Sequence, residues 1–305
     1  MFRGQMAAAL PSVSVVVPVY NDAERLARCL AALERQTYPR ERVEVIVVDN
    51  GSTDDSAEVP ARYAGVRLLR EASPSSYAAR NRGVAAATGE VLAFTDADCV
   101  PDPRWLDEGV AMVRHAPNCG LVAGAIEFFF RSPGRPTLFE IYDAVFDFDQ
   151  KRAVELGRFA CTANLFTPAA VLRAVGLFDA TLKSVGDREW GNRVAAAGYT
   201  LGFARAAIVR HPARSELRDV LHKRLRVAGG HHDVQRRHSR PMLTFVKALV
   251  RYLIMSPVRG ARRVRQKVPT LRPGVRMVLL GLHVALCCAE AAERTRLQAG
   301  GVSRR

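Results

Sequence analysis

The chain has 305 residues, of which 49% are hydrophobic, and it carries a formal net charge of +15 at pH 7. This length and apolar content allow a full hydrophobic core, and no internal repeat or low-complexity tract interrupts it. The 6 cysteines lack C-x-x-C spacing, which favours reduced thiols in the cytosol over a disulfide framework. Residues 1–11 lack the apolar region of a signal peptide, so none is expected.

Strand and helix patterns alternate from the N-terminus. The β-branched run at 13–17 predicts a strand, and a helix with a leucine stripe follows it. We expect Asn21 to cap this helix and Glu24 to complete a capping box. The later elements predicted in this part are strands at 43–48 and 66–69, a helix after 49–55, a helix at 77–87 and a strand from residue 91. This winding predicts an α/β fold.

Acidic residues stand where predicted strands end. The apolar run V-L-A-F-T stops at Asp96 and Asp98, and the strand at 43–48 stops at Asp49. In an open α/β sheet, ligands bind beyond the carboxyl ends of the strands, so these residues are expected to face one crevice. Two carboxylates at i and i+2 suit a divalent cation and a diphosphate, and the alternative is a solvated turn. No G-x-G-x-x-G or G-x-x-x-x-G-K-[ST] motif supports a dinucleotide site or a P-loop.

Five blocks together resemble the inverting glycosyltransferases of family 2, which have a GT-A fold (a Rossmann-like nucleotide-diphospho-sugar transferase fold) and use nucleotide-sugar donors. They are V-S-V-V-V-P-V-Y-N-D (13–22), V-E-V-I-V-V-D-N-G-S-T-D-D-S (43–56), S-Y-A-A-R-N-R-G (76–83), F-T-D-A-D-C-V-P-D-P-R-W-L (94–106) and G-D-R-E-W-G-N-R-V-A-A-A-G-Y (186–199). The blocks occur in the family's order over roughly the first 210 residues.

The resemblance implies a donor pocket in the N-terminal half. Pro18, Tyr20 and Asn21 would line the base and ribose pocket, and Asp49 would accept a hydrogen bond from the nucleobase. Arg80 would lie near the diphosphate or sugar of a UDP-, GDP- or dTDP-linked donor, where a guanidinium makes paired bonds. The alternative for Arg80 is surface charge.

The resemblance also implies a metal site. Asp96 would touch ribose or a metal-bound water, and Asp98 would ligate Mn²⁺ or Mg²⁺ between the two phosphates. A bound cation stabilises the departing nucleoside diphosphate as a Lewis acid. His211 follows the strand predicted at 203–209 and would complete the site, since neutral imidazole suits Mn²⁺. A structural histidine in a turn is the alternative.

A second acidic site lies at 187–189. An inverting transfer needs a carboxylate that takes the proton of the acceptor hydroxyl, and Asp187 aligns with the family's general base. Gly186 stands where the family commonly has Glu, which puts the acceptor or the tuning of the base in doubt. Glu189 and Trp190 would support the acceptor or the base. The competing explanation is that these acidic residues only stabilise a helix N-terminus, where the helix dipole favours negative charge.

The C-terminal third is basic and partly apolar. Basic residues crowd 210–240 and 259–267, a pattern that suits an anionic membrane leaflet or nucleic acid. The apolar stretch 242–258 carries its two charges four residues apart, so it is expected to be one interfacial helix. A second stretch at 277–289 is about thirteen residues long, short of a membrane span. Alternatively, both stretches pack on the catalytic domain.

The middle of the chain is less informative. Gly124, Pro133, Gly134 and Pro136 predict a loop between the donor and acceptor halves. The aromatic runs at 128–130 and 141–149 are expected either to line an acceptor groove or to belong to the core.

These patterns predict a tail at 1–11, a GT-A catalytic domain at 12–215 (donor half about 12–120, acceptor half about 121–215) and a helical appendage at 216–305. The expected activity is a metal-dependent, inverting transfer of one sugar to a hydroxyl of a glycan or lipid-linked acceptor in envelope polysaccharide or glycolipid synthesis. The sequence lacks the Q-x-x-R-W block and the multiple spans associated with processive synthases, so single transfers are expected and not polymerisation. The expected location is the cytoplasmic side of the membrane, peripheral or monotopic. A noncatalytic scaffold is the alternative. The chain lacks the interleaved aromatic residues that RNA-binding proteins use for stacking, so no nucleic acid is expected as a partner.

Overall fold

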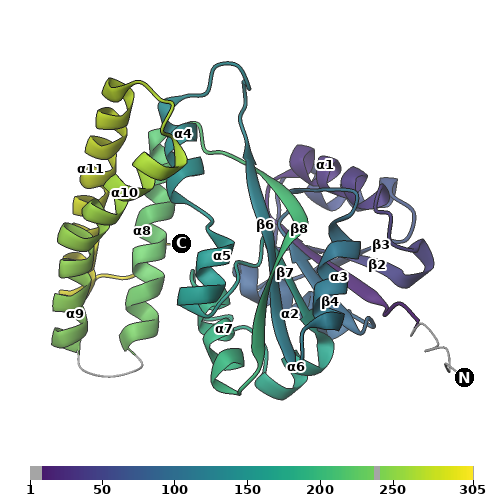
Figure 1. The fold of residues 1–305 in the computed structure, drawn as a ribbon. Coiled ribbons are helices and arrows are strands. Elements are labelled where there is room, and N and C mark those ends of the chain that lie inside the picture. The colour runs from purple at the N-terminus through teal and green to yellow at the C-terminus, as the bar shows by residue number, and fades with distance from the viewer. Residues whose placement is uncertain (1–8, 237–240, 305) are drawn as a thin grey trace, which may run out of the picture.

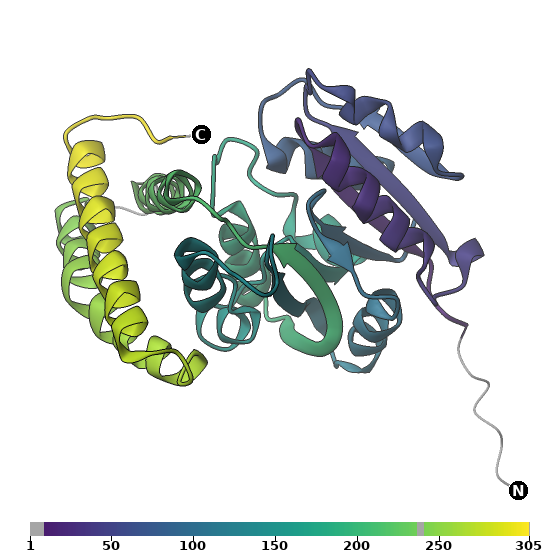
Figure 2. The ribbon, with the colours of Figure 1, turned by 90° about the horizontal axis from the view of Figure 1, so that it is seen from above.

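The computed structural model describes residues 9–236 and 241–304. A mixed β-sheet with helices on both faces forms one part, and helices from the last third of the chain form a bundle beside it (Figure 1, and from above in Figure 2). Helix α4 (Leu138–Phe146) lies between the two parts. The arrangement agrees with the α/β fold and the C-terminal helical appendage that the sequence predicts.

The sheet has eight strands in the order β3-β2-β1-β4-β7-β6-β8-β5. In chain order these are β1 (Val13–Val19), β2 (Val43–Asp49), β3 (Val66–Arg70), β4 (Val91–Thr95), β5 (Val100–Pro101), β6 (Cys119–Phe129), β7 (Asn164–Pro168) and β8 (Thr200–Pro212). The strands β1 to β4 run parallel, whereas β7 is antiparallel to both β4 and β6. The parallel strands therefore deliver their carboxyl ends to one edge of the sheet.

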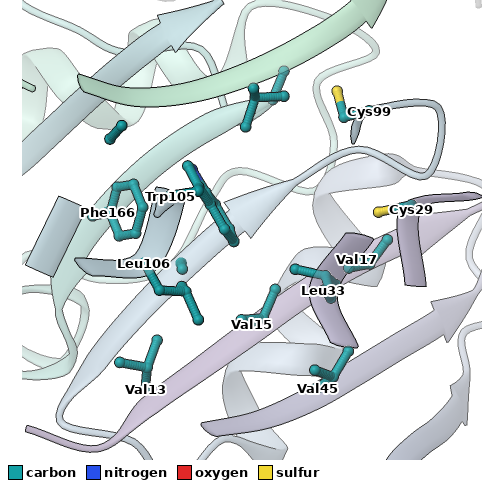
Figure 3. Close-up of a cluster of buried hydrophobic side chains, with 14 of the residues drawn as sticks. Val13, Val15, Val17, Cys29, Leu33, Val45, Cys99, Trp105, Leu106 and Phe166 are labelled. Atoms are coloured by element: carbon teal, nitrogen blue, oxygen red, sulfur yellow. The ribbon is translucent and has the colours of Figure 1, made fainter. Parts of the chain in front are cut away.

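Helices cover the sheet on both faces because strand residues alternate in direction. Val15 and Val17 of β1 pack in the cluster that includes α1 (Ala23–Glu34) and α3 (Trp105–His115), which Figure 3 shows, whereas Val16 packs on the other face. That other face is covered by α2 (Ser76–Ala86), α6 (Ala169–Val175) and α7 (Gly186–Ala196). Short 3-10 helices are η1 (Arg40–Arg42), η2 (Asp55–Ala57) and η3 (Val59–Arg62).

Asn164 joins three strands and one helix. Its Oδ1 accepts a hydrogen bond from the indole of Trp105 at 2.8 Å, and its Nδ2 donates to the carbonyl oxygens of Ala125 and Ala207 at 2.8 and 2.9 Å. Both Asn164 and Trp105 are fully buried. The side chain of Asn164 thus fixes how β6, β7 and β8 meet.

Asn164→Ala is expected to lower the free energy of unfolding by roughly 2 to 5 kcal/mol, because a buried indole N–H and two carbonyl groups lose their partner. Urea unfolding followed by circular dichroism measures the change. The control Asn192→Ala, at an exposed position of α7, is expected to be near neutral. Equal stabilities for the two variants would contradict the role given to Asn164.

The bundle consists of α8 (Leu217–Arg236), α9 (Pro241–Val250), the π-helical η5 (Arg251–Met255), α10 (Ser256–Lys267) and α11 (Pro273–Gln298). Its core with α4 contains Tyr142, Val220 and Leu279. Arg224 of α8 donates to Glu290 of α11 at 2.7 Å in a largely buried ion pair. Between α4 and β7 lie α5 (Gln150–Arg152) and η4 (Ala153–Gly157).

The predicted cap of the first helix is wrong. Asn21 has a left-handed φ of 49°, and its Oδ1 accepts the N–H of Thr53 at 2.7 Å, so Asp22 becomes the N-cap of α1. The N–H of Ala23 at the helix start donates to Asp54 instead, at 3.2 Å. A side chain distant in sequence therefore takes the capping role. The helix predicted after 49–55 is only the short pair η2 and η3.

Two further elements, the loop after β6 and the strand β8, differ from the prediction in their bounds. Gly124 lies inside β6, where an added Cβ would come within 2.3 Å of the Asn164 amide, so the loop begins only after Phe129. The strand predicted at 203–209 extends over all of β8, which places His211 inside the strand. Pairing with β6 explains that extension, because Phe128 lies opposite His211 in register.

The apolar C-terminal stretches are longer helices than predicted. The stretch at 242–258, expected to form one helix, is divided over α9, η5 and the start of α10, and α10 extends beyond it. The stretch at 277–289 lies within the 26-residue α11, which by length and composition alone could cross a membrane. Of its most apolar window, 33% is buried in the protein, because α11 packs on α8 and α10.

Candidate active site

A cavity of about 980 Å³ lies between the sheet and the helices of the bundle. Both parts of the protein contribute to its wall, since β1 and the loop after β4 supply residues on one side and α8, η5 and α10 on the other. The sequence-predicted site residues in this wall are Pro18, Tyr20, Arg80, Asp96, Asp98, Asp187 and His211. The fold thus brings together residues that are up to about 190 positions apart in the chain.

Two predicted donor residues lie outside the cavity wall. The carboxylate of Asp49 is buried and accepts the N–H of Ser52 at 3.1 Å, while the neighbouring Asn50 lines the cavity. Asn21 holds the loop at Thr53, as described above. Both residues therefore shape the loop beside the cavity.

Glu189 and Trp190 do not reach the cavity either. Glu189 accepts from Arg193 at 2.8 Å within α7, and the fully buried Trp190 donates its indole N–H to the carbonyl oxygen of Gly176 at 2.9 Å. The prediction that they support the acceptor or the base stays a prediction, and from this placement they would do so only by holding α7 in position, because a helix sends neighbouring residues to different faces.

Arg80 and Asp96 form an ion pair at the cavity. Nη2 of Arg80 lies 2.5 Å from Oδ1 of Asp96, and Nη1 donates to the carbonyl oxygen of Ser76 at 3.1 Å. The Arg80 side chain is only 5% exposed, and within the described residues its Nε has no hydrogen-bond partner. A buried guanidinium with an unused donor is suited to an anion in the cavity.

Asp98, Cys99 and His211 could hold a metal ion, because each offers a ligand atom within 4.8 Å of the others. Nε2 of His211 lies 3.5 Å from Oδ2 of Asp98. Nδ1 of His211 lies 2.7 Å from the carbonyl oxygen of Pro212, which can only accept, so Nδ1 carries the proton. With the proton on Nδ1, Nε2 is the ring nitrogen that would bind a metal ion shared with Asp98.

Cys99 is the member of this group that the sequence reasoning missed, although it directly follows Asp98. Burial, with the charges of Asp98 and Asp96, holds the pKa of its thiol well above the ordinary value. A protonated thiol is a poor ligand. One carboxylate and one imidazole remain as the better donors, a set that fits Mn²⁺.

Aromatic rings position His211. The ring of Phe148 lies 4.9 Å from the imidazole, and the ring of Phe128 lies 5.8 Å from it. Phe148 has a φ of 28°, an unfavourable backbone conformation for a bulky residue. Of the two possibilities for the aromatic runs, Phe148 lines the cavity, whereas Tyr142 belongs to the core.

Asp187 lies in the first turn of α7. Its Oδ1 accepts the N–H of Arg188 at 2.9 Å, and burial raises the pKa of its carboxyl. The N–H of Gly186 donates to the hydroxyl of Tyr77 at 2.8 Å, and an added Cβ at Gly186 would lie 2.7 Å from that ring. Tyr77 thus occupies the space of the side chain that the family commonly has there.

The sequence profile of Glycosyl transferase family 2 matches residues 14–168. Glycosyltransferase AglE of Haloferax volcanii is 40% identical to the chain over 230 residues, which cover 74% of this chain and 74% of that protein. The chain belongs to glycosyltransferase family 2. It is an enzyme that transfers sugars.

Two other comparisons extend over most of the chain. The pre-mycofactocin glycosyltransferase of Mycobacterium tuberculosis is 28% identical over 292 residues, covering 92% of this family 2 chain and 59% of that protein. The mannosyltransferase PcManGT from Pyrobaculum calidifontis, solved in complex with GDP-Man and Mn²⁺, superposes with a TM-score of 0.65 at 19% identity. That match covers 95% of this chain and 87% of the other. It confirms the predicted GT-A fold.

The sequence reasoning also missed one side of the cavity of this family 2 enzyme. The basic residues on that side are Arg188, Arg214, Lys223, Arg226, Arg251, Arg259 and Arg263. Five of them, Arg214, Lys223, Arg226, Arg259 and Arg263, belong to the basic runs at 210–240 and 259–267, which by their pattern suit an anionic membrane leaflet or nucleic acid. Part of that charge instead faces the cavity, because α8 turns one of its sides toward the sheet.

Proposed function

We propose that this enzyme transfers a single sugar, with inversion, from a nucleoside-diphosphate-sugar to a hydroxyl of a glycan or lipid-linked acceptor, and that it depends on a divalent metal. The observation that carries the proposal is the shared cavity. The ligand pair Asp98 and His211, the guanidinium of Arg80 and the carboxylate of Asp187 all line it. An inverting transfer needs these groups at one place.

The donor side of the proposal rests on charge. Asp98 and His211 would hold Mn²⁺ or Mg²⁺, which when bound stabilises charge on the departing diphosphate as a Lewis acid. Arg80 would donate to the diphosphate or sugar, and Pro18 and Tyr20 would bind the base and ribose. PcManGT, which shares the fold, was solved with GDP-Man and Mn²⁺.

The acceptor side rests on Asp187. Its carboxylate would take the proton of the acceptor hydroxyl as that oxygen attacks the anomeric carbon opposite the diphosphate. A carboxyl whose pKa is raised by burial is a better base than a solvated one. We place the catalytic domain at 12–215, with the bundle at 216–305 completing the wall around this base.

We also propose that the enzyme binds the cytoplasmic face of the membrane, in envelope polysaccharide or glycolipid synthesis. Apolar side chains on α9, η5 and α10 are exposed at helical spacing, as on interfacial helices. They are Val246, Val250, Leu253, Ile254 and Val258. Because nucleotide sugars are made in the cytosol, the proposed face of the membrane is the cytoplasmic one.

Thermal unfolding with a panel of nucleoside diphosphates and nucleotide sugars tests the donor proposal. We expect one nucleotide class to raise the Tm by several degrees with Mn²⁺ and much less with EDTA, because ligands stabilise the state they bind. The released nucleoside diphosphate and the anomer formed are then followed by NMR. Absence of stabilisation by any nucleotide with metal would contradict the proposal.

The pH dependence of donor consumption should reflect Asp187. Since only the ionised carboxyl is a base, the rate is expected to fall as the pH drops through a pKa that lies above 3.8. Burial is the largest cause of the raised pKa, and the ionisable groups around it are Tyr77, Arg80, Asp96, Cys161, Arg188 and Arg226. A rate–pH profile that stays flat down to pH 3.8 in folded protein would contradict this role.

A further inference from the structure

The cavity carries more positive charge on its bundle side than neighbouring carboxylates neutralise. Some cations there are paired: Arg214 and Lys223 both pair with Asp147, and Arg263 donates to Asp149 at 2.7 Å. These pairs join the bundle to the segment after α4. They account for the charge of three basic residues and hold the wall together.

Arg188, Arg226 and Arg251 are different. In the described parts of the chain, no carboxylate lies at ion-pair distance from any of them. Arg188 and Arg251 lie over the rings of Phe159 and Tyr252, at 5.4 and 5.8 Å, and Arg226 donates to the hydroxyl of Ser184 and to the carbonyl oxygen of Lys183. They come from α7, α8 and η5 and line the same cavity. The charges of Arg251 and Asp187 both act on Arg188, and the charge of Asp187 also acts on Arg226. Three guanidiniums thus share a partly dry wall with one carboxylate, which is unfavourable without a further anion.

The pKa values of the groups in this wall indicate the same excess of positive charge. Burial, followed by the charge of Arg251, lowers the pKa of Arg188, and burial lowers the pKa of Arg226. Burial, with the charges of Arg251 and Arg188, lowers the pKa of His231 to about 3. The neutral His231 therefore adds no charge but reports the positive potential around it. A phosphate group would relieve that potential through charge-assisted hydrogen bonds.

Exposed apolar side chains line the same cavity as these arginines. Met255 and Leu156 line the cavity and are 42% and 72% exposed. Met255 ends η5 and continues the exposed apolar residues of α9 and α10 described above. An exposed apolar stripe that ends beside a cluster of unpaired cations fits an amphiphile with an anionic head.

We propose that Arg188, Arg226 and Arg251 form a subsite for the phosphate of a lipid-phosphate acceptor, whose chain lies along the stripe ending at Met255. This inference rests on the proposed function and names its acceptor class. Arg188 follows the base Asp187 directly, so the subsite would hold the lipid phosphate of an acceptor whose attached glycan carries the reacting hydroxyl, with that hydroxyl near the carboxylate. The phosphate binds as an anchor, separate from the donor diphosphate at Asp98.

Binding of decyl phosphate, decanol and inorganic phosphate by the purified full chain tests this. The site variant is Arg226→Gln/Arg251→Gln. The matched control is Arg218→Gln/Arg262→Gln, which removes the same charge from exposed positions of α8 and α10 that do not line the cavity. We expect decyl phosphate to bind at least tenfold more weakly to the site variant and within twofold of the original affinity to the control.

Decanol and inorganic phosphate should each bind wild type at least tenfold more weakly than decyl phosphate. Decanol binding as tightly would overturn the phosphate subsite, and inorganic phosphate binding as tightly would overturn the lipid chain. Equal loss in the two double variants, with equal loss of binding to phosphatidylglycerol vesicles, would assign the charge to general membrane attraction and overturn the proposal.

Donor binding in the same samples separates this inference from the proposed function. The Mn²⁺-dependent Tm shift by the nucleotide should be the same in the site variant and the control. If it falls in the site variant alone, the arginines bind the donor and the acceptor assignment is wrong. If the shift is absent in wild type as well, the proposed function itself fails, whatever decyl phosphate does.

Discussion

Asp187→Asn is expected to lower the rate of donor consumption roughly 100- to 10,000-fold, the usual contribution of a positioned general base. The amide keeps the shape of the side chain but cannot accept the proton of the attacking hydroxyl. Release of nucleoside diphosphate from the stabilising nucleotide sugar, with water in place of the acceptor, measures the rate. Donor affinity should change little, because the donor is held elsewhere in the cavity.

Glu189→Gln is the matched control for this experiment. It removes a carboxylate two residues further along α7, where the side chain pairs with Arg193 and does not line the cavity. Its rate should stay within tenfold of wild type. Comparable losses in the two variants would show that the charge of the α7 N-terminus matters, and that Asp187 is no base.

Asp187→Asn should not destabilise the fold. Burial raises the pKa of Asp187 in the folded protein above 3.8, so the folded state binds this proton more tightly than the unfolded chain. The carboxyl therefore favours folding most below pH 3.8, and this contribution is lost as the pH rises through the folded-state pKa. At pH 7, Asp187→Asn should have a Tm equal to or above that of wild type.

Asp98→Asn is expected to weaken Mn²⁺ binding roughly 100-fold or more, since replacing even an outer partner of a ligand costs 10- to 100-fold. The amide lacks the charge that a hard cation prefers. Isothermal titration with Mn²⁺ and nucleotide measures the affinity, and donor consumption should fall with it. High Mn²⁺ should restore part of the rate.

Asp219→Asn, at an exposed position of α8, is the control for the loss of one negative charge. It should bind Mn²⁺ as wild type does. His211→Ala gives an independent check, because it removes the second ligand and leaves the carboxylate of Asp98 in place. Unchanged Mn²⁺ affinity in both Asp98→Asn and His211→Ala would rule out this metal site.

Local sequence predicted much of the donor half. The β-branched strands, the leucine stripe of α1 and the acids at the carboxyl ends of β2 and β4 are each signals within a few neighbouring residues. The placement of Asp96 and Asp98 at one edge then follows from parallel winding alone. The five family blocks added the roles proposed for Arg80 and Asp187.

Contacts between distant segments decided what the sequence could not predict. The cap of α1 passed to Asp22 because Asn21 bonds to Thr53, and His211 became part of a long strand because β6 pairs with it. Periodicity does not report such contacts, since their partners lie many residues away.

The sequence by itself determined the fold class, the family and the acidic edge of the sheet, because short motifs and strand periodicity encode them. The tertiary structure decided which basic residues face the cavity. Arg188, Arg226 and Arg251 come from three elements, and only the docking of the bundle against the sheet brings their charges into the cavity that Asp187 also lines.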